Sequence, residues 1–151
     1  MKKRSYWLQL VETAFRARSV LWLAGVRRCG KTTLCRSLPG VEYFDCELPR
    51  HRAMLEDAET FFKPLRGRTV VLDEVHRLPN PSETLKIAAD HFPKVRVIAT
   101  GSSTLAASSK FKDTLTGRKT TLLMTPMMSN DLVDFGAQGL DRRFLRGGLP
   151  P

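Results

Sequence analysis

Residues 25–32 read GVRRCGKT, which matches the phosphate-binding pattern G-x-x-x-x-G-K-[ST]. The two glycines, Gly25 and Gly30, let successive backbone N–H groups point inward at phosphate oxygens. The ammonium of Lys31 can meet the β- and γ-phosphates, and the hydroxyl of Thr32 can bind Mg²⁺. The octet therefore predicts a binding site for ATP and Mg²⁺.

The other residues of this loop have predicted roles of their own. Arg27, Arg28 and Cys29 are expected to offer backbone amides to the phosphates while their side chains face solvent. Val26 completes the binding loop, and Thr33 is expected to contact the α-phosphate. An ordinary position in the following helix is the alternative for Thr33.

A pair of carboxylates follows an apolar run further along the chain. Val-Val-Leu at 70–72 leads into Asp73 and Glu74, as in a buried strand that ends in two acids. Asp73 is predicted to hold Mg²⁺ through water, and Glu74 is predicted to orient or deprotonate the attacking water. This pairing favours hydrolysis of ATP, and a solvated loop acid is the alternative for Glu74.

Two more positions could assist the chemistry. In TGSS at 100–103, Ser102 is the first choice for a hydroxyl beside the γ-phosphate and Thr100 the second. A turn hydroxyl with only local hydrogen bonds is the alternative. Arg118 is the candidate for an arginine that stabilises transition-state charge, in its own site or in a neighbour's, and a surface cation is the competing interpretation.

These residues need a scaffold that brings the ends of several strands together. Apolar runs alternate with amphipathic segments, which indicates a layered sheet with its ligand at the carboxyl ends of the strands. The predicted strands cover residues 19–24, 41–45, 69–73, 94–100 and 120–124. The predicted helices cover residues 5–17, 32–38, 51–62, 82–91, 130–135 and 141–146. The fold class is therefore α/β, a three-layer P-loop NTPase with a mostly parallel five-stranded sheet.

Composition narrows the class of protein and its partners. The chain has 151 residues, 42% of them hydrophobic, which suits one ordinary domain, and no stretch approaches the roughly 18 apolar residues of a membrane span. Three cysteines, an odd number, agree with a reducing compartment, so a cytoplasmic location is expected. The net charge is +10, and residues 1–36 hold nine basic residues and one acidic residue. Nucleic acid is therefore a candidate partner, and a solvated basic surface is the alternative.

Five motifs occur in a fixed order, at residues 25–33, at 73–79 (DEVHRLP), at 100–103, at 116–118 (TGR) and at 145–150 (LRGGLP). Their combination resembles the prokaryotic AAA-type ATPases whose P-loop domain precedes a C-terminal domain of unknown function. The resemblance implies an ASCE-type core, in which the strand before Ser102 lies between the phosphate-loop strand and the Asp-Glu strand. It also implies that Ser102 is the sensor-like hydroxyl and Arg118 the matching arginine. Val26 departs from the proline that is frequent in this family.

The resemblance also suggests how the chain is organised. Residues 1–18 are expected to form an N-terminal amphipathic helix, residues 19–128 the P-loop ATPase core, and residues 129–151 a short helical segment that leads to a second domain. Because the sequence stops in a loop-like segment, we expect a truncated chain without that second domain.

The predicted function is Mg²⁺-dependent ATP binding and hydrolysis coupled to movement of an attached domain or partner. Self-association is a further expectation if Arg118 serves a neighbouring subunit. Two alternatives stay open. One is a non-catalytic nucleotide switch or nucleic-acid-binding module, which the basic N-terminal third favours. The other is a small-molecule kinase, for which Arg142 and Arg143 are the candidate lid arginines.

Overall fold

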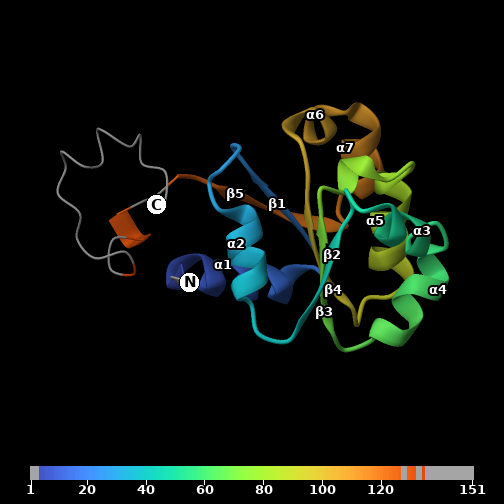
Figure 1. The fold of residues 1–151 in the computed structure, drawn as a ribbon, viewed down its shortest axis with the longest axis horizontal. Helices are drawn as coiled ribbons and strands as arrows, with labels where there is room; N and C mark the ends of the chain where they lie inside the picture. The colour runs from blue at the N-terminus through green and yellow to red at the C-terminus, as the bar shows by residue number, and fades with distance from the viewer. Residues whose placement is uncertain (1–3, 127–128, 132–133, 135–151) are drawn as a thin grey trace.

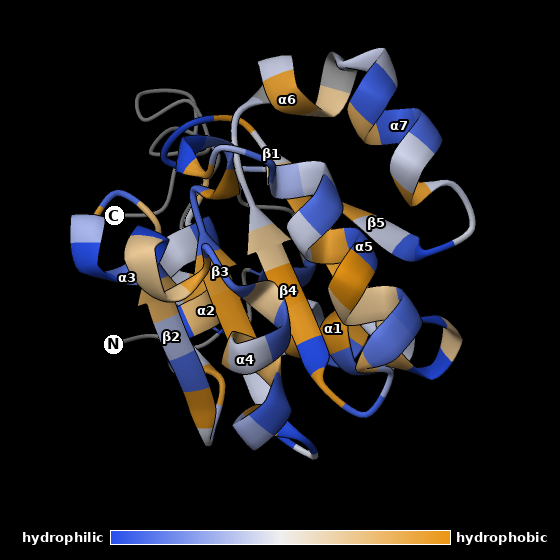
Figure 2. Ribbon diagram, turned by 90° about the vertical axis from the view of Figure 1, so that its right-hand side faces the viewer, coloured by the Kyte–Doolittle hydropathy of each residue, from blue (hydrophilic) through white to orange (hydrophobic). Residues whose placement is uncertain are grey.

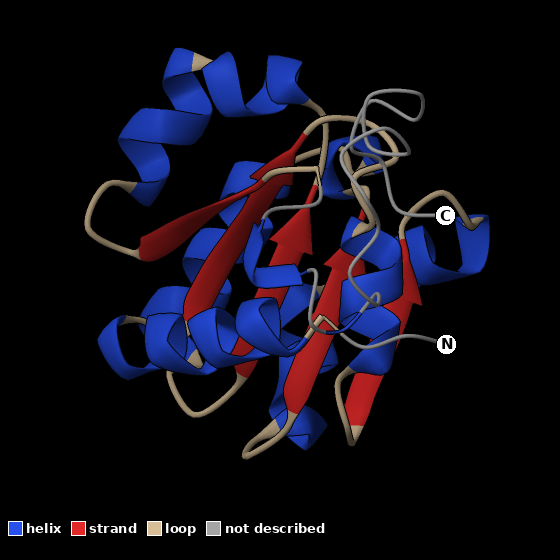
Figure 3. Ribbon diagram, turned by 90° about the vertical axis from the view of Figure 1, so that its left-hand side faces the viewer, coloured by secondary structure: helices blue, strands red, loops and turns tan. Residues whose placement is uncertain are grey.

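The structure is a computed structural model that describes residues 4–126, 129–131 and 134. Within those residues, five strands form one parallel sheet in the order β2-β3-β4-β1-β5 (Figure 3). The strands are Val20–Gly25 (β1), Val41–Asp45 (β2), Thr69–Asp73 (β3), Arg96–Thr100 (β4) and Lys119–Met124 (β5). The α/β class and the five-stranded sheet expected from the sequence are confirmed, and every strand pair is parallel.

The helices alternate with these strands along the chain. The α-helices are Ser5–Ala17 (α1), Lys31–Ser37 (α2), Pro49–Met54 (α3), Ala58–Phe62 (α4), Pro81–His91 (α5), Ser103–Ala107 (α6) and Ser109–Leu115 (α7). Three 3₁₀ turns cover Lys63–Leu65 (η1), Val75–Arg77 (η2) and Ser129–Asp131 (η3). No helix among the described residues is both long enough and apolar enough to cross a membrane.

Helices cover both faces of the sheet, which gives three layers (Figure 1). On one face, α1 and α2 pack over a core that includes Trp7, Leu21 and Ile98. On the other face, a larger core includes Trp22, Phe62 and Phe111 and lies under α4, α5 and α7. Because both faces are covered, β3 and β4 are almost entirely buried. Figure 2 shows the largely hydrophobic colouring of these two strands.

The central strands have the order that the family resemblance implies. The strand β4 lies between β1 and β3, with Val20 opposite Val97 and Val71 opposite Ile98. Since all strands run the same way, the loops that follow β1, β3 and β4 meet at one edge of the sheet. That carboxyl edge carries most of the residues with predicted chemical roles.

Two segments differ from the sequence-based prediction. The single helix expected over 51–62 is interrupted, because the carboxylate of Asp57 accepts a hydrogen bond from Thr60 N at 3.0 Å and begins α4 as an N-cap. After β4 the sequence indicated only a turn, whereas the structure has α6 and α7, capped by Ser102 and Ser108. The predicted helix over 130–135 is described only in part, as η3, and the one over 141–146 lies outside the described residues.

Candidate active site

The loop between β1 and α2 has a backbone that only glycine allows at its first position. Gly25 has a φ of 153°, and a Cβ there would lie 2.4 Å from Met124 O on the neighbouring strand. Gly30 has a φ of 97° where the loop enters α2, and Arg28 has a φ of 64° within the turn. These positive φ values curl the loop over the end of β1.

Lys31 lies inside this curl. Its ammonium donates hydrogen bonds to Gly25 O at 2.9 Å and to Val26 O at 3.0 Å. Both acceptors are neutral carbonyls, whereas phosphate oxygens carry charge and form stronger bonds with an ammonium. The lysine is thus held at the mouth of the loop by partners that an anion can replace.

The side chain of Cys29 corrects one expectation. Arg27 and Arg28 are exposed, but Cys29 is fully buried. Its thiol packs beneath the loop among apolar residues of β1 and α2, so close to Gly25 that a Cβ there would lie 2.9 Å from Cys29 Sγ. The side chain is therefore a part of the core that supports the loop, and it does not face solvent.

Asp73, at the end of β3, is the polar centre of the site. Its side chain is 5% exposed, and its two oxygens accept hydrogen bonds from three hydroxyls. Thr32 Oγ1 lies 2.9 Å from Asp73 Oδ2, which also accepts from the phenol of Tyr43. Thr100 Oγ1 donates to Asp73 Oδ1. The carboxylate is held in one orientation by residues from α2, β2 and β4.

Tyr43 was not identified as a site residue from the sequence. Burial raises the pKa of its phenol, and donation to Asp73 raises it further, so the group stays protonated and continues to donate. The guanidinium of Arg36 lies over the Tyr43 ring, 4.8 Å from its centre.

The donor set suits Mg²⁺, which prefers hard oxygen ligands and usually takes few of them from the protein. A hydroxyl and a carboxylate oxygen, those of Thr32 and Asp73, already lie 2.9 Å apart beside Lys31. Among the described residues no cluster of three or more histidine, cysteine or acidic side chains could hold a metal without help. The arrangement fits an ion that is completed by phosphate oxygens and water.

Glu74 follows Asp73 in an unusual backbone conformation. Its φ of 58° and ψ of 46° are left-handed, which is uncommon for residues other than glycine and is often found at functional sites. Its backbone N–H donates to Thr100 Oγ1 at 3.1 Å, which fixes the turn. The side chain is 38% exposed, so its carboxylate is accessible to water.

The imidazole of His76 connects Glu74 with the turn after β4. His76 Nδ1 lies 3.1 Å from Glu74 Oε2, and it also accepts a hydrogen bond from Ser102 N at 3.3 Å. A ring nitrogen donates a hydrogen bond when it carries a proton and accepts one when it does not. Nδ1 with its proton can donate to the Glu74 carboxylate, and Nδ1 without it can accept from Ser102 N.

The structure assigns different surroundings to Thr100 and Ser102. Thr100 is fully buried and bonds to both Asp73 and Glu74, whereas Ser102 Oγ accepts from Leu105 N at 3.3 Å and caps α6. Between them, Gly101 packs against Trp22, where a Cβ would lie 2.7 Å from the ring. Thr33 lies exposed in the first turn of α2.

A cavity of about 660 Å³ lies at the carboxyl edge of the sheet. Its lining includes Gly25, Lys31, Glu74, His76 and Ser102. Apolar surface is contributed by Trp22, Val26 and Leu123, and the last two are 58% and 66% exposed. The volume is within the usual range for a small-molecule site.

A buried arginine supports the loop from behind. Arg4, which is 5% exposed, donates from Nη1 to Cys29 O at 2.8 Å. It also donates from Nε to Asp131 Oδ1 at 2.9 Å and from Nη2 to Asp131 Oδ2 at 2.5 Å. The N-terminal helix, the phosphate loop and the segment after β5 are thereby joined at one side chain.

Arg118 lies at the opposite edge of the sheet from the phosphate loop. It precedes β5, and its Nε donates to both oxygens of Asp90, at 2.8 and 3.1 Å. This hydrogen bond lowers the pKa of Asp90 and raises that of Arg118. Within one chain, therefore, the structure brings Glu74, Ser102, Thr32 and Asp73 together but leaves Arg118 apart.

Comparisons with known proteins agree with this architecture. A family model described as "AAA domain" matches residues 17–133. Uncharacterized proteins of Mycobacterium bovis and Mycobacterium tuberculosis are each 31% identical to the chain over 137 residues, which is 87% of this chain and 30% of theirs. The chain thus spans under a third of the length of these curated relatives.

Two solved structures show the same fold at low identity. The Walker-type ATPase PABY2304 of Pyrococcus abyssi has a TM-score of 0.63 at 19% identity, covering 100% of this chain and 60% of that one. The ORC1 protein of Aeropyrum pernix, solved in complex with DNA, has a TM-score of 0.57 at 20% identity, covering 97% and 50%. With a family match over most of its length and this fold around its phosphate loop, the chain belongs to the AAA domain family of P-loop proteins.

Proposed function

We propose that this chain binds Mg²⁺-ATP at the carboxyl edge of its sheet and hydrolyses it. The observation that carries the proposal is the contact of 2.9 Å between Thr32 Oγ1 and Asp73 Oδ2. Their chain neighbours Lys31 and Glu74 both line one cavity. A phosphate loop alone would support binding. A metal-binding pair beside an accessible carboxylate supports hydrolysis as well.

Each of these residues has a role in the proposed reaction. Lys31 exchanges its bonds to the loop carbonyls for bonds to phosphate oxygens, and Thr32 and Asp73 hold the metal, Asp73 through water. When bound, Mg²⁺ polarises the transferring phosphoryl group and screens its charge. Glu74 accepts a proton from the attacking water, which adds to the γ-phosphorus as the bond to the leaving ADP oxygen breaks.

The nucleotide base has a suitable surface in the same cavity. Trp22, Val26 and Leu123 offer apolar contacts, whereas polar groups cluster at the phosphate end. The small-molecule kinase alternative stays open, and its candidate lid residues Arg142 and Arg143 lie outside the described residues. A cytoplasmic location stays a prediction.

Coupling to an attached domain or partner is part of the proposal. Arg4 connects Cys29 O in the phosphate loop to Asp131, beyond the last strand, and so offers a route out of the site. The role of Arg118 in a neighbouring subunit's site also stays a prediction, and it implies self-association. Its position far from its own phosphate loop argues against a role in its own site, and its ion pair with Asp90 also fits the surface-cation alternative.

The test is phosphate release from Mg²⁺-ATP by the purified chain, with Lys31→Ala as the background. Glu74→Gln should keep ATP binding and lose turnover, because an amide cannot take the water proton. The matched control is Glu56→Gln, at an exposed position on the loop between α3 and α4. Turnover by Glu74→Gln equal to that of the unmodified chain would refute the assignment, and absence of ATP binding would refute the site itself.

A further inference from the structure

The amino edge of the sheet, opposite the nucleotide cavity, is rich in basic residues. They occur in the segments that enter β1, β3, β4 and β5. These residues are Arg16, Arg18, Arg66, Arg68, Lys94, Arg96, Arg118 and Lys119. Three of them have acidic partners, in the pairs Arg96–Glu12, Arg68–Glu42 and Arg118–Asp90. A net positive charge therefore remains along this edge.

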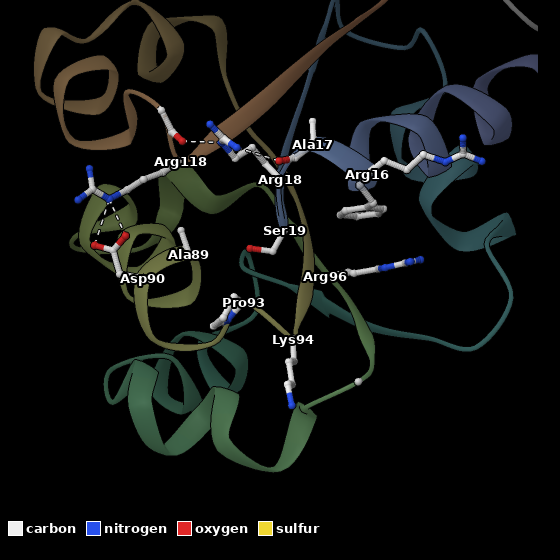
Figure 4. Close-up of a pocket in the computed structure, with 13 residues that line it drawn as sticks. Arg16, Ala17, Arg18, Ser19, Ala89, Asp90, Pro93, Lys94, Arg96 and Arg118 are labelled. Atoms are coloured by element: carbon white, nitrogen blue, oxygen red, sulfur yellow. Dashed lines mark hydrogen bonds and ion pairs between the residues drawn. The ribbon is translucent and has the colours of Figure 1, made fainter.

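A second cavity, of about 630 Å³, opens at the same edge (Figure 4). Its lining includes five cationic side chains and one carboxylate: Arg16, Arg18, Lys94, Arg96, Arg118 and Asp90. In the close-up these residues lie around Ser19, with Arg118 turned toward Asp90 and the charged ends of Arg16, Lys94 and Arg96 extending outward. The lining is thus suited to an anion.

Two of these cations have no partner among the described residues. The side chains of Arg16 and Lys94 are exposed and form no hydrogen bond or ion pair with the described residues. Arg16 lies in the last turn of α1, where the helix dipole stabilises a positive charge. Lys94 lies in the segment between the end of α5 and the start of β4, outside the last turn of the helix. The helix dipole therefore does not account for its charge.

The spread of the charges favours a polyanion over a single small phosphate compound. The four basic segments enter strands that are neighbours in the order β3-β4-β1-β5. Three strand spacings of about 4.8 Å make a stripe of about 14 Å. One strand of a duplex carries a phosphate about every 3.4 Å along the axis, so the stripe can meet about four of them.

We propose that this amino edge binds the phosphate backbone of nucleic acid without reading its bases. The cations of Arg16, Arg18, Lys94 and Arg96 would contact phosphates. Among the described residues that line the cavity the only aromatic ring is that of Phe15, and the guanidinium of Arg96 already covers it at 5.4 Å. Base stacking has no free platform in this cavity, so affinity comes from charge and depends on salt. The site is separate from the nucleotide cavity, and the proposal does not depend on ATP hydrolysis.

The test is binding of the full chain to a fluorescent 20-base-pair DNA, followed by anisotropy at several salt concentrations. The double variant Arg16→Ala/Lys94→Ala removes two unpartnered cations from the amino edge. Arg50→Ala/Lys110→Ala is the matched control, because it removes one arginine and one lysine that are also exposed, on α3 and α7. The same binding measurement is repeated with duplexes of unrelated sequence, and with saturating Mg²⁺-ATP present.

We expect the amino-edge variant to lower the slope of log affinity against log salt by about 1.8, at about 0.9 per lost contact. The control should keep the original slope, unrelated sequences should bind alike, and Mg²⁺-ATP should not compete. Equal weakening by both double variants would overturn the proposal, since it would indicate diffuse net charge. Failure of the unmodified chain to bind at 50 mM salt, or binding to anionic lipid vesicles alone, would also overturn it.

Discussion

The phenol of Tyr43 donates a hydrogen bond to Asp73 Oδ2, the same oxygen that accepts from Thr32 Oγ1. Two elements, β2 and α2, thus act on one carboxylate oxygen at the end of β3. Such outer contacts orient metal-binding carboxylates, and their loss commonly costs about 10–100-fold in metal affinity.

Tyr43→Phe should therefore raise the Mg²⁺ concentration needed for half-maximal ATP turnover, by about tenfold or more. The fold should be unaffected, because the ring and its contact with Arg36 remain. Phosphate release during a Mg²⁺ titration measures the effect, with Tyr6→Phe as the control. A lower Mg²⁺ requirement would show instead that the phenol competes with the ion.

Thr100→Val should damage the site more than Ser102→Ala. The valine leaves the N–H of Glu74 without its acceptor and removes a donor to Asp73, whereas the alanine removes only the cap of α6. We expect Thr100→Val to lower the free energy of unfolding by about 1–3 kcal/mol and to reduce turnover. Urea unfolding and phosphate release measure these effects, and Thr100→Ser should restore both. The opposite ranking would favour Ser102 over Thr100 as the sensor-like hydroxyl.

Arg4→Met should destabilise the protein and weaken ATP binding together. The change removes the ion pair that Arg4 forms with the fully buried carboxylate of Asp131 and the hydrogen bond that Arg4 donates to Cys29 O. Breaking a buried ion pair on one side costs about 3–5 kcal/mol. Denaturant unfolding and ATP titration test this, and Arg4→Met/Asp131→Asn should recover part of the stability. A loss of stability with unchanged ATP affinity would separate Arg4 from the loop.

Alkaline pH should lower the free energy of unfolding through two buried thiols. Burial raises the pKa of Cys35 and of Cys46 from 9.0 to about 12 in each case. The unfolded thiols release protons above pH 9 while the folded ones keep them, so stability falls as pH rises from about 9 toward 12. Urea unfolding at pH 8, 9 and 10 measures the slope, and Cys35→Ala/Cys46→Ala should flatten it. An identical slope in that variant would contradict the prediction.

The central strands β1, β3 and β4 could be predicted well from the sequence because they are largely buried on both faces and leave unbroken apolar runs. The segments Val41–Asp45 and Thr69–Asp73 were predicted with their observed bounds. The helices α6 and α7 were missed because they are short, five and seven residues, and their caps Ser102 and Ser108 read as turn residues.

The candidate site was predicted where one motif supplies neighbouring residues, and it was missed where distant residues meet. Lys31 and Thr32 are adjacent at the start of α2, and Asp73 and Glu74 are adjacent at the end of β3. Arg4 and Asp131 are 127 positions apart, and nothing in their local sequence indicates a contact. Tyr43 reaches Asp73 only because β2 and β3 are neighbours, which the pattern of its own strand does not reveal.

The strand β4 has one end at each of the two cavities. Arg96 begins it at the basic edge, and Thr100 ends it beside Asp73, four residues or about 13 Å away. Because β4 is paired with β1 on one side and β3 on the other, a shift of Arg96 on binding a polyanion would be passed along the strand toward Thr100. If such a coupling exists, any change that bound nucleotide makes in the affinity for the polyanion is matched by an equal change that the polyanion makes in the affinity for nucleotide.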